Sequence, residues 1–272
     1  MPAVAVALVG LADSRLHAGA WVQSRGGGLV IVSLYGYRAA ERYSPDGSRQ
    51  PLGPGGIFES LSVQFWAELG LSDRWTAILS GAAPRLRYED PFYRAAATTL
   101  GDFQLGFRRA LRSPDRGWQL AIQTLVKAPA YSQRIEPRPG NGQGDLEVSL
   151  LSGRSFPVAG RWGFLDAQGG YRIRWGRPSD QWRGELTFGL HLSSRLTLMG
   201  QGFAVRRRGP LPEVALGVNP LTEPAFDLYR AQASAIVRIA PSWRIQAGGL
   251  TDIAGRNIAR GRGWMFALWK SF

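Results

Sequence analysis

The strongest constraint on the fold of this chain is the alternation of apolar and polar residues along many of its segments. Gln181–Leu192 is the clearest case, because its even-numbered and odd-numbered positions, which we call its two parities, differ in polarity. The apolar parity holds Trp182, Leu186, Phe188, Leu190 and Leu192, and the polar parity holds Arg183, Glu185, Thr187 and His191. A β-strand sends successive side chains to opposite faces, so this pattern predicts a strand with one apolar and one charged face.

Twelve segments share this pattern, and an even number of strands is typical of bacterial single-chain barrels. They are Gly28–Arg38, Phe58–Leu69, Arg74–Tyr88, Thr99–Arg109, Trp118–Lys127, Gly144–Arg154, Arg161–Trp175, Gln181–Leu192, Arg195–Arg206, Phe226–Ile239, Ser242–Thr251 and Arg262–Phe272.

The connections between these segments alternate between short and long. The short ones are Gly70–Asp73, Ser113–Arg116, Phe156–Gly160, Ser193–Ser194 and Ala240–Pro241, and the clearest long ones are Ala39–Ile57, Ala128–Gln143 and Arg207–Ala225. A Greek-key sandwich has no reason to sort its loops in this way. The alternation predicts an all-β fold, an antiparallel up-and-down transmembrane β-barrel of about 12 strands in the bacterial outer membrane, with short periplasmic turns and longer extracellular loops. Both termini then lie in the periplasm.

The first 20 residues have the features of a signal peptide. An apolar run, Ala3–Ala12, is followed by Ala18-Gly19-Ala20, which fits an A-x-A cleavage site. The usual basic residues before the run are missing, and the alternative is a first buried strand or an irregular start. We expect a signal peptide over 1–20 and a single barrel domain over 21–272.

The last strand carries the pattern with which outer-membrane barrels typically end. Phe272, Leu268, Phe266 and Trp264 share one parity, and only Lys270 departs from it. This pattern predicts that the barrel-insertion machinery is a partner of the last strand.

The composition narrows the function classes. The net charge of +13 comes from arginines spread along the whole chain, which is a poor footprint for nucleic acid and suits outer-membrane lipid and lipopolysaccharide, or a lumen that favours anions. No segment has the roughly 18 unbroken apolar residues of a membrane-spanning helix. The chain has no cysteine, so disulfides and thiolate metal sites are excluded. We expect no cofactor and no metal, and we interpret Glu89-Asp90 as a solvated loop pair.

Several tryptophans fall near the ends of predicted strands, where an interfacial girdle is expected. They are Trp118, Trp162, Trp182, Trp243 and Trp264. The alternative is the packed core of a soluble β-protein.

Two strand openings resemble those of a known group. Leu100–Arg108 (LGDFQLGFR) and Gly144–Leu150 (GDLEVSL) resemble the repeated openings of outer-membrane proteins grouped under the meta-pathway of phenol degradation, and Glu68–Thr76 and Leu192–Leu198 resemble a hairpin of the same family. The resemblance covers most of the chain after the predicted signal. It implies a porin-like barrel and the passage of small aromatic compounds.

The polar parity of the strands gives the candidate site, a set of residues expected to line the lumen and contact a solute. They are Glu68, Arg108, Glu147, Asp166, Gln168, Arg172, Arg174, Arg183, Glu185, Arg230 and Arg244, joined by Gln232 and Gln246. One hypothesis is a mostly cationic conduit for small anionic or amphipathic solutes. The other is that these residues pair across the interior as salt bridges and close the barrel.

Three functions follow from these patterns. The first is a passive channel or transporter for small, aromatic or anionic molecules. The second is a non-conducting barrel whose long loops Ala39–Ile57 and Arg207–Ala225 bind a protein partner. The third is a lipid hydrolase that uses His191 and Ser193, whose spacing fits a nucleophile and base on one strand. Because that pair would lie beside a periplasmic turn, far from lipid in the outer leaflet, we expect no enzyme.

Overall fold

The computed structural model describes residues 19–111, 117–176, 178–211 and 223–272, and within these ranges the chain is built from fourteen β-strands. Twelve of them form the wall of one antiparallel sheet. These are β1 (Gly28–Tyr43), β3 (Ile57–Ser72), β4 (Trp75–Glu89), β6 (Asp102–Ala110), β7 (Trp118–Pro129), β8 (Asp145–Val158), β9 (Arg161–Arg174), β10 (Gln181–His191), β11 (Leu196–Arg207), β12 (Asp227–Ala240), β13 (Trp243–Arg256) and β14 (Ile258–Ser271). Two short strands, β2 (Arg49–Pro51) and β5 (Arg94–Thr98), extend the wall at β1 and β4.

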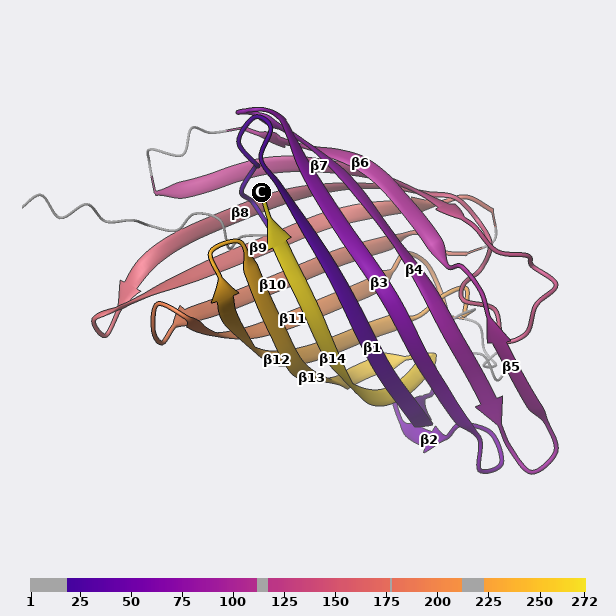
Figure 1. Ribbon diagram of the computed structural model, residues 1–272. Coiled ribbons are helices and arrows are strands. Elements are labelled where there is room, and N and C mark those ends of the chain that lie inside the picture. The colour runs from indigo at the N-terminus through magenta and orange to yellow at the C-terminus, as the bar shows by residue number, and fades with distance from the viewer. Residues whose placement is uncertain (1–18, 112–116, 177, 212–222) are drawn as a thin grey trace, which may run out of the picture.

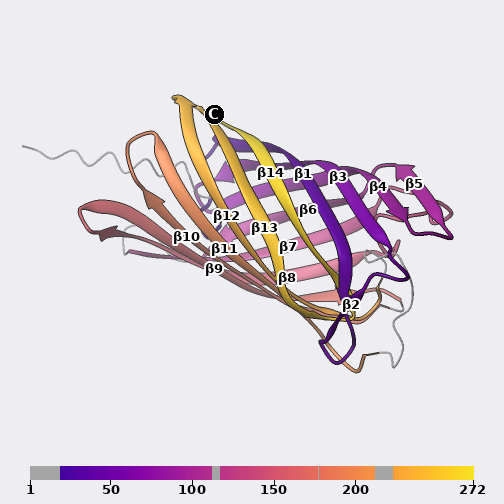
Figure 2. The same cartoon turned by 90° about the horizontal axis from the view of Figure 1, so that it is seen from below.

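The sheet closes on itself because the last strand pairs with the first. Each wall strand pairs with its neighbours in chain order, and β14 pairs with β1 from Leu29↔Ser271 to Tyr43↔Ile258. Figures 1 and 2 both show β14 beside β1. The predicted fold, a closed antiparallel barrel of twelve strands, is therefore confirmed.

The polarity of the two faces is opposite to that of a water-soluble protein. Leu105, Leu150 and Phe266 are more than half exposed on the outer face, whereas Glu68 and Arg108 on the inner face are only 2% exposed. An apolar band outside and a polar interior suit a wall surrounded by lipid. Within the described ranges the chain forms no helix that is long and apolar enough to cross a membrane.

The order of short and long connections is as predicted over most of the chain. Tight turns join β3 to β4, β8 to β9 and β12 to β13, and Figure 1 places the C-terminus at this end of the barrel. We call it the turn end, and the opposite end the loop end. The predicted turn Ser113–Arg116 lies outside the described residues.

The prediction was wrong at the last hairpin. It left residues 252–261 as a connector, whereas β13 and β14 continue through them and are joined by Asn257 alone, at a φ of 53°. Three glycines and three arginines between Gly255 and Gly263 hid this part of the hairpin, because it rises beyond the apolar band and loses the alternation there. Asn tolerates the left-handed backbone conformation that so tight a connection needs.

Tryptophans mark both borders of the apolar band. Trp75, Trp118, Trp162 and Trp243 open their strands at the turn end, and Trp175, Trp182 and Trp264 lie toward the loop end. All seven are more than a third exposed, as expected for interfacial girdles. Lys270, which breaks the apolar pattern of the last strand, lies at the border of the apolar band nearer the turn end. Its Nζ is 4.9 Å from the Trp243 ring centroid and 2.7 Å from Ser242 Oγ.

Closure at the seam of β1 and β14 predicts a sensitive position. At Gly263 a Cβ atom would lie 2.2 Å from the carbonyl oxygen of Gly36 on β1. Gly263→Ala is expected to force the two strands apart and to destabilise the barrel by about 1–3 kcal/mol, as overpacking does. The measurement is the temperature at which the folded band disappears from unheated electrophoresis samples. Gly200→Ala on β11, where nothing lies within 4 Å of the added atom, should unfold like the unchanged protein, and equal loss in both variants would contradict the interpretation.

Candidate functional site

The inner face of the barrel carries all eleven predicted site residues. They are Glu68 on β3, Arg108 on β6, Glu147 on β8, Asp166, Gln168, Arg172 and Arg174 on β9, Arg183 and Glu185 on β10, Arg230 on β12 and Arg244 on β13. Their contact with a solute stays a prediction. The structure divides them into ion-pair groups and a central cavity.

One group of ion pairs lies near the turn end. The Arg108 guanidinium is 3.0 Å from the Glu68 carboxylate and also donates to Gln123 Oε1 at 2.9 and 3.1 Å. Both charged side chains are almost fully buried, so each depends on the other to offset the loss of water. The positive charge of Arg108 is therefore already neutralised within the protein.

The segment before β1 lies across the lumen beside this pair. Arg108 donates a hydrogen bond of 2.9 Å to the carbonyl of Trp21, and Gln23 Nε2 donates one of 2.8 Å to Glu68. On the far wall, the amide of Ala20 donates to Asp166 on β9 at 2.7 Å. Because β3 and β9 lie on opposite sides of the ring, residues 19–27 span the interior and narrow it.

This inward segment was missed by sequence reasoning. Gly19 and Ala20 were assigned to the predicted signal peptide, whose residues 1–18 lie outside the described residues. One sequence signal could have indicated the segment: Gly153 stands on the inner face of β8, where a Cβ atom would lie 2.5 Å from the Trp21 ring. A glycine amid inward polar residues leaves space for an object inside the barrel.

A second group of ion pairs lines the wall from β6 to β10. Glu147 accepts from Arg172 and from Arg183, each at 2.8 Å. Lys127 lies 3.0 Å from Asp145 and 2.9 Å from Asp102. The guanidinium and ammonium groups here are therefore paired with carboxylates of the same wall.

The same holds on the other side of the barrel. Arg230 Nε lies 2.7 Å from Asp252, which also accepts a 2.6 Å hydrogen bond from the Tyr37 hydroxyl. These pairings favour the hypothesis in which inward charges form salt bridges, and they leave little of the expected cationic character.

Between the charged groups lies a cavity of about 490 Å³. Seven glutamines supply half of its polar lining residues: Gln64, Gln104, Gln123, Gln168, Gln201, Gln232 and Gln246. Apolar and aromatic side chains supply the rest, chiefly Ile31, Tyr35, Trp66, Phe164, Met199, Phe203, Met265 and Trp269. The cavity is thus lined mainly by neutral amides, rings and thioethers, together with four charged residues, Asp102, Arg108, Asp166 and Glu185.

Sequence reasoning missed these apolar lining residues because it assigned apolar side chains to the lipid. In β14, Met265 and Trp269 have the inward parity, opposite to Trp264, Phe266 and Leu268, and they are buried with Leu29 and Ile236. The signal was present in the sequence, since a strand that is apolar on both faces departs from strict alternation.

A loop segment lies across the loop end of the barrel. On one side, Glu223 is 3.3 Å from Arg42 of β1 and accepts from Asn257 at the hairpin of β13 and β14. On the other side, the carbonyl of Pro224 accepts from Ser179 at 2.9 Å and from Arg174 of β9 at 3.3 Å. Residues 223–225 therefore bridge opposite walls. Burial raises the pKa of Glu223, and the nearby Arg42 opposes that rise.

The residues of the hydrolase hypothesis have structural roles. Nδ1 of His191 lies 2.8 Å from Thr197 Oγ1, and Ser193 Oγ accepts from the amides of Arg195 and Leu196 in the turn. In the loop pair Glu89-Asp90, Glu89 forms ion pairs with Arg87 and Arg94. In the parts of the chain that the structure describes, no group of three or more His, Cys, Asp or Glu residues could hold a metal ion.

Comparison with known proteins supports the class and not a family. No protein-family model matches the chain, and no curated protein matches its sequence. An outer membrane channel from Pseudomonas putida F1 superposes with a TM-score of 0.69 at 11% identity, covering 94% of this chain and 99% of that one. The NanC porin superposes with a TM-score of 0.51 at 11% identity, covering 89% of this chain and all of that one. The closed fold, the apolar outer face and the polar lumen together define an outer-membrane β-barrel.

The buried pair of Glu68 and Arg108 gives a test of the inward segment. Glu68→Ala removes the partner of a buried guanidinium and a contact of Gln23, and breaking a buried pair costs about 3–5 kcal/mol. We expect a large loss of stability toward urea, together with a larger single-channel conductance as residues 19–27 loosen. Glu136→Ala, which removes a half-exposed carboxylate 3.0 Å from Arg138, is the control and should cost less than about 1 kcal/mol. Unchanged conductance in a folded Glu68→Ala barrel would show that the segment does not limit flow.

Proposed function

We propose that this protein is a passive outer-membrane channel for small, weakly polar molecules that carry an aromatic ring. The observation that carries the proposal is the central cavity, whose lining combines seven glutamines with rings and thioethers. Such surfaces accept a ring by contact and a hydroxyl or carbonyl by hydrogen bonding. The resemblance to the phenol-degradation group and the fold shared with an outer membrane channel agree with this class of solute.

The same geometry argues against selection of anions by charge. Arg108, Arg172, Arg183 and Arg230 all have carboxylate partners within about 3 Å. A paired guanidinium attracts a passing anion weakly, because the field of its partner cancels its own. Passage of an acidic aromatic would therefore depend on its ring more than on its charge.

Permeation through proteoliposomes tests the proposal. Swelling rates are compared for a neutral phenol, a benzoate and a neutral sugar of similar size. We expect the phenol to enter fastest and the benzoate to have no advantage over it. Rates that follow size alone would contradict the proposed selectivity, and no entry of any solute would favour a non-conducting barrel.

One variant separates the cavity from the rest of the pore. Met199→Gln keeps the length of the side chain but replaces a thioether in the cavity lining with an amide that must be desolvated. It is expected to slow the phenol several-fold relative to the sugar. Leu198→Met, one residue away on the outer face, is the matched control and should change neither rate.

We further propose that the loop end faces the outside of the cell and both termini face the periplasm. The long connectors gather at the loop end, as extracellular loops of bacterial barrels do. Since the chain has no cysteine, single cysteines are clean probes. Arg134→Cys in the connector of β7 and β8 should react with a membrane-impermeant maleimide on intact cells, and Ser194→Cys in the turn of β10 and β11 only after permeabilisation. The reverse result would invert the orientation.

A further inference from the structure

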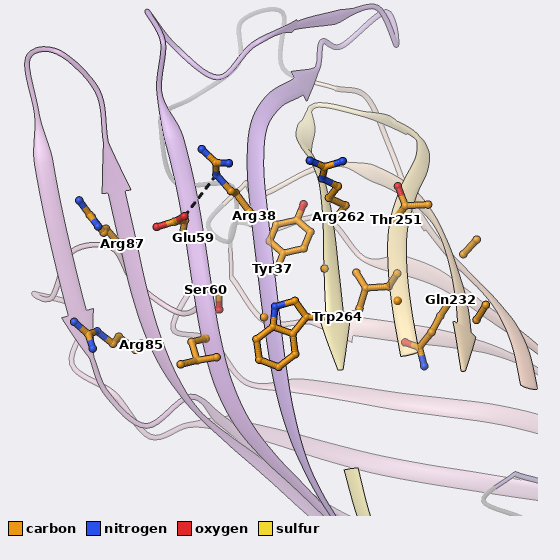
Figure 3. Close-up of a pocket in the computed structure, with 17 residues that line it drawn as sticks. Tyr37, Arg38, Glu59, Ser60, Arg85, Arg87, Gln232, Thr251, Arg262 and Trp264 are labelled. Atoms are coloured by element: carbon orange, nitrogen blue, oxygen red, sulfur yellow. Dashed lines mark ion pairs between the residues drawn. The ribbon is translucent and has the colours of Figure 1, made fainter. Parts of the chain in front are cut away.

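The outer wall carries a hollow that the channel function does not use. It has a volume of about 1010 Å³ and extends over β12, β13, β14, β1, β3 and β4. Figure 3 shows it with its arginines and Trp264. Most of its lining comes from outward side chains near the loop end, so it opens toward the lipid and not toward the lumen.

Two rows of outward residues form this hollow, each row made of residues that pair directly across neighbouring strands, and both rows contain arginine. The upper row is the one nearer the loop end. The upper row, followed across the six strands, is Ala231, Thr251, Arg262, Arg38, Glu59 and Arg87. The lower row is Ala233, Gly249, Trp264, Gly36, Leu61 and Arg85. Figure 3 shows Arg262, Arg38, Glu59 and Arg87 following one another across β14, β1, β3 and β4.

The next row toward the turn end is wholly apolar. It consists of Ala235, Ala247, Phe266, Leu34, Val63 and Ala83. On each of the six strands the two rows therefore follow this apolar row directly on its loop-end side. In a lipid-facing wall this is the depth of the headgroups, where arginine costs little and meets anionic groups.

The charges in the hollow are unbalanced. Four arginines face one glutamate, and that glutamate lies 3.5 Å from Arg38 with both side chains about half exposed. Arg87 also pairs with Glu89, which lies two residues further toward the loop end on β4. Among the described residues, no carboxylate forms an ion pair with Arg85 or Arg262. This differs from the lumen, where the arginines have nearby acids.

The floor of the hollow is apolar and low. Gly36, Gly249, Ala231 and Ala233 carry little or no side chain, and the Trp264 ring lies over Gly36, where a Cβ atom would be 2.3 Å from it. Leu61 lies on the other side of Gly36. Small residues beside a flat ring leave a shallow channel along the wall, of the kind that an acyl chain fills.

We propose that this hollow binds a phosphorylated glycolipid of the outer leaflet, with phosphates on Arg85 and Arg262 and an acyl chain against Trp264. Guanidinium groups match phosphate oxygens through paired hydrogen bonds, which fits arginine and not lysine at all four positions. The chemistry is that of the anchor of lipopolysaccharide. The inference rests on the orientation proposed above, because only with the loop end outward do the two rows lie in the outer leaflet.

Binding to the purified, refolded barrel in detergent tests the inference. The probe is lipid A with both phosphates, titrated while tryptophan fluorescence and native mass spectra are recorded. We expect a saturable one-to-one complex that forms about tenfold more weakly with the fully dephosphorylated lipid. Equal binding of phosphatidylglycerol would overturn the choice of a glycolipid, and no complex would overturn the site.

Variants assign the complex to the hollow. The double variant Arg85→Gln and Arg262→Gln is expected to weaken lipid A binding about tenfold, and the corresponding lysine variant should bind with intermediate strength. The matched control is Arg109→Gln with Arg154→Gln, two arginines that lie over Trp75 and Trp118 at the opposite border. Equal weakening by both pairs would overturn the assignment. Since no solute is present, a barrel that fails to conduct can still pass this test, so the two proposals fail separately.

Discussion

Closure of the sheet between β14 and β1 is the interaction on which the rest of the structure depends. Backbone amides and carbonyls in hydrocarbon must find partners within the protein, and a sheet meets this requirement only when no edge is left. The register from Leu29↔Ser271 to Tyr43↔Ile258 supplies these partners along the whole seam. It also fixes which side chains face each other across the lumen, so the arrangement of the interior follows from it.

The interior shows how a strongly basic chain folds around buried charge. Arginines on the inner face lie beside acids of nearby strands: Arg172 on the adjacent strand β9 and Arg183 on β10, one strand further, both contact Glu147. Burial of these groups is tolerable because they are paired and hydrogen-bonded. The middle of the lumen is left to amides and rings, and segments at both ends narrow the way in. Residues 19–27 bridge β3 and β9, and residues 223–225 bridge β1 and β9. The lumen is therefore narrowed near both ends by segments that are held by hydrogen bonds.

The outer wall uses arginine in a different way. Arg38, Arg85, Arg87 and Arg262 lie where lipid headgroups meet the apolar band, in a hollow with one acid. Some arginines are thus placed toward an anionic surface and others beside acids of the same chain. Only the position of each arginine relative to the seam and the band separates the two roles, since their local sequences are alike.

The sequence by itself determined the number of strands, their two faces and most of the order of short and long connections, because a period of two residues and the chemistry of tight turns are local properties. It also placed Glu68, Arg108 and Arg172 on the inner parity for the same reason. It did not reveal the pairing of Glu147 with Arg183, the inward path of Trp21, the tight connection at Asn257 or the apolar lining from Met265 and Trp269. These depend on register, on closure and on contacts between residues far apart in the chain. Only the tertiary structure sets those, because a parity gives a direction for each side chain but not the neighbour that it meets.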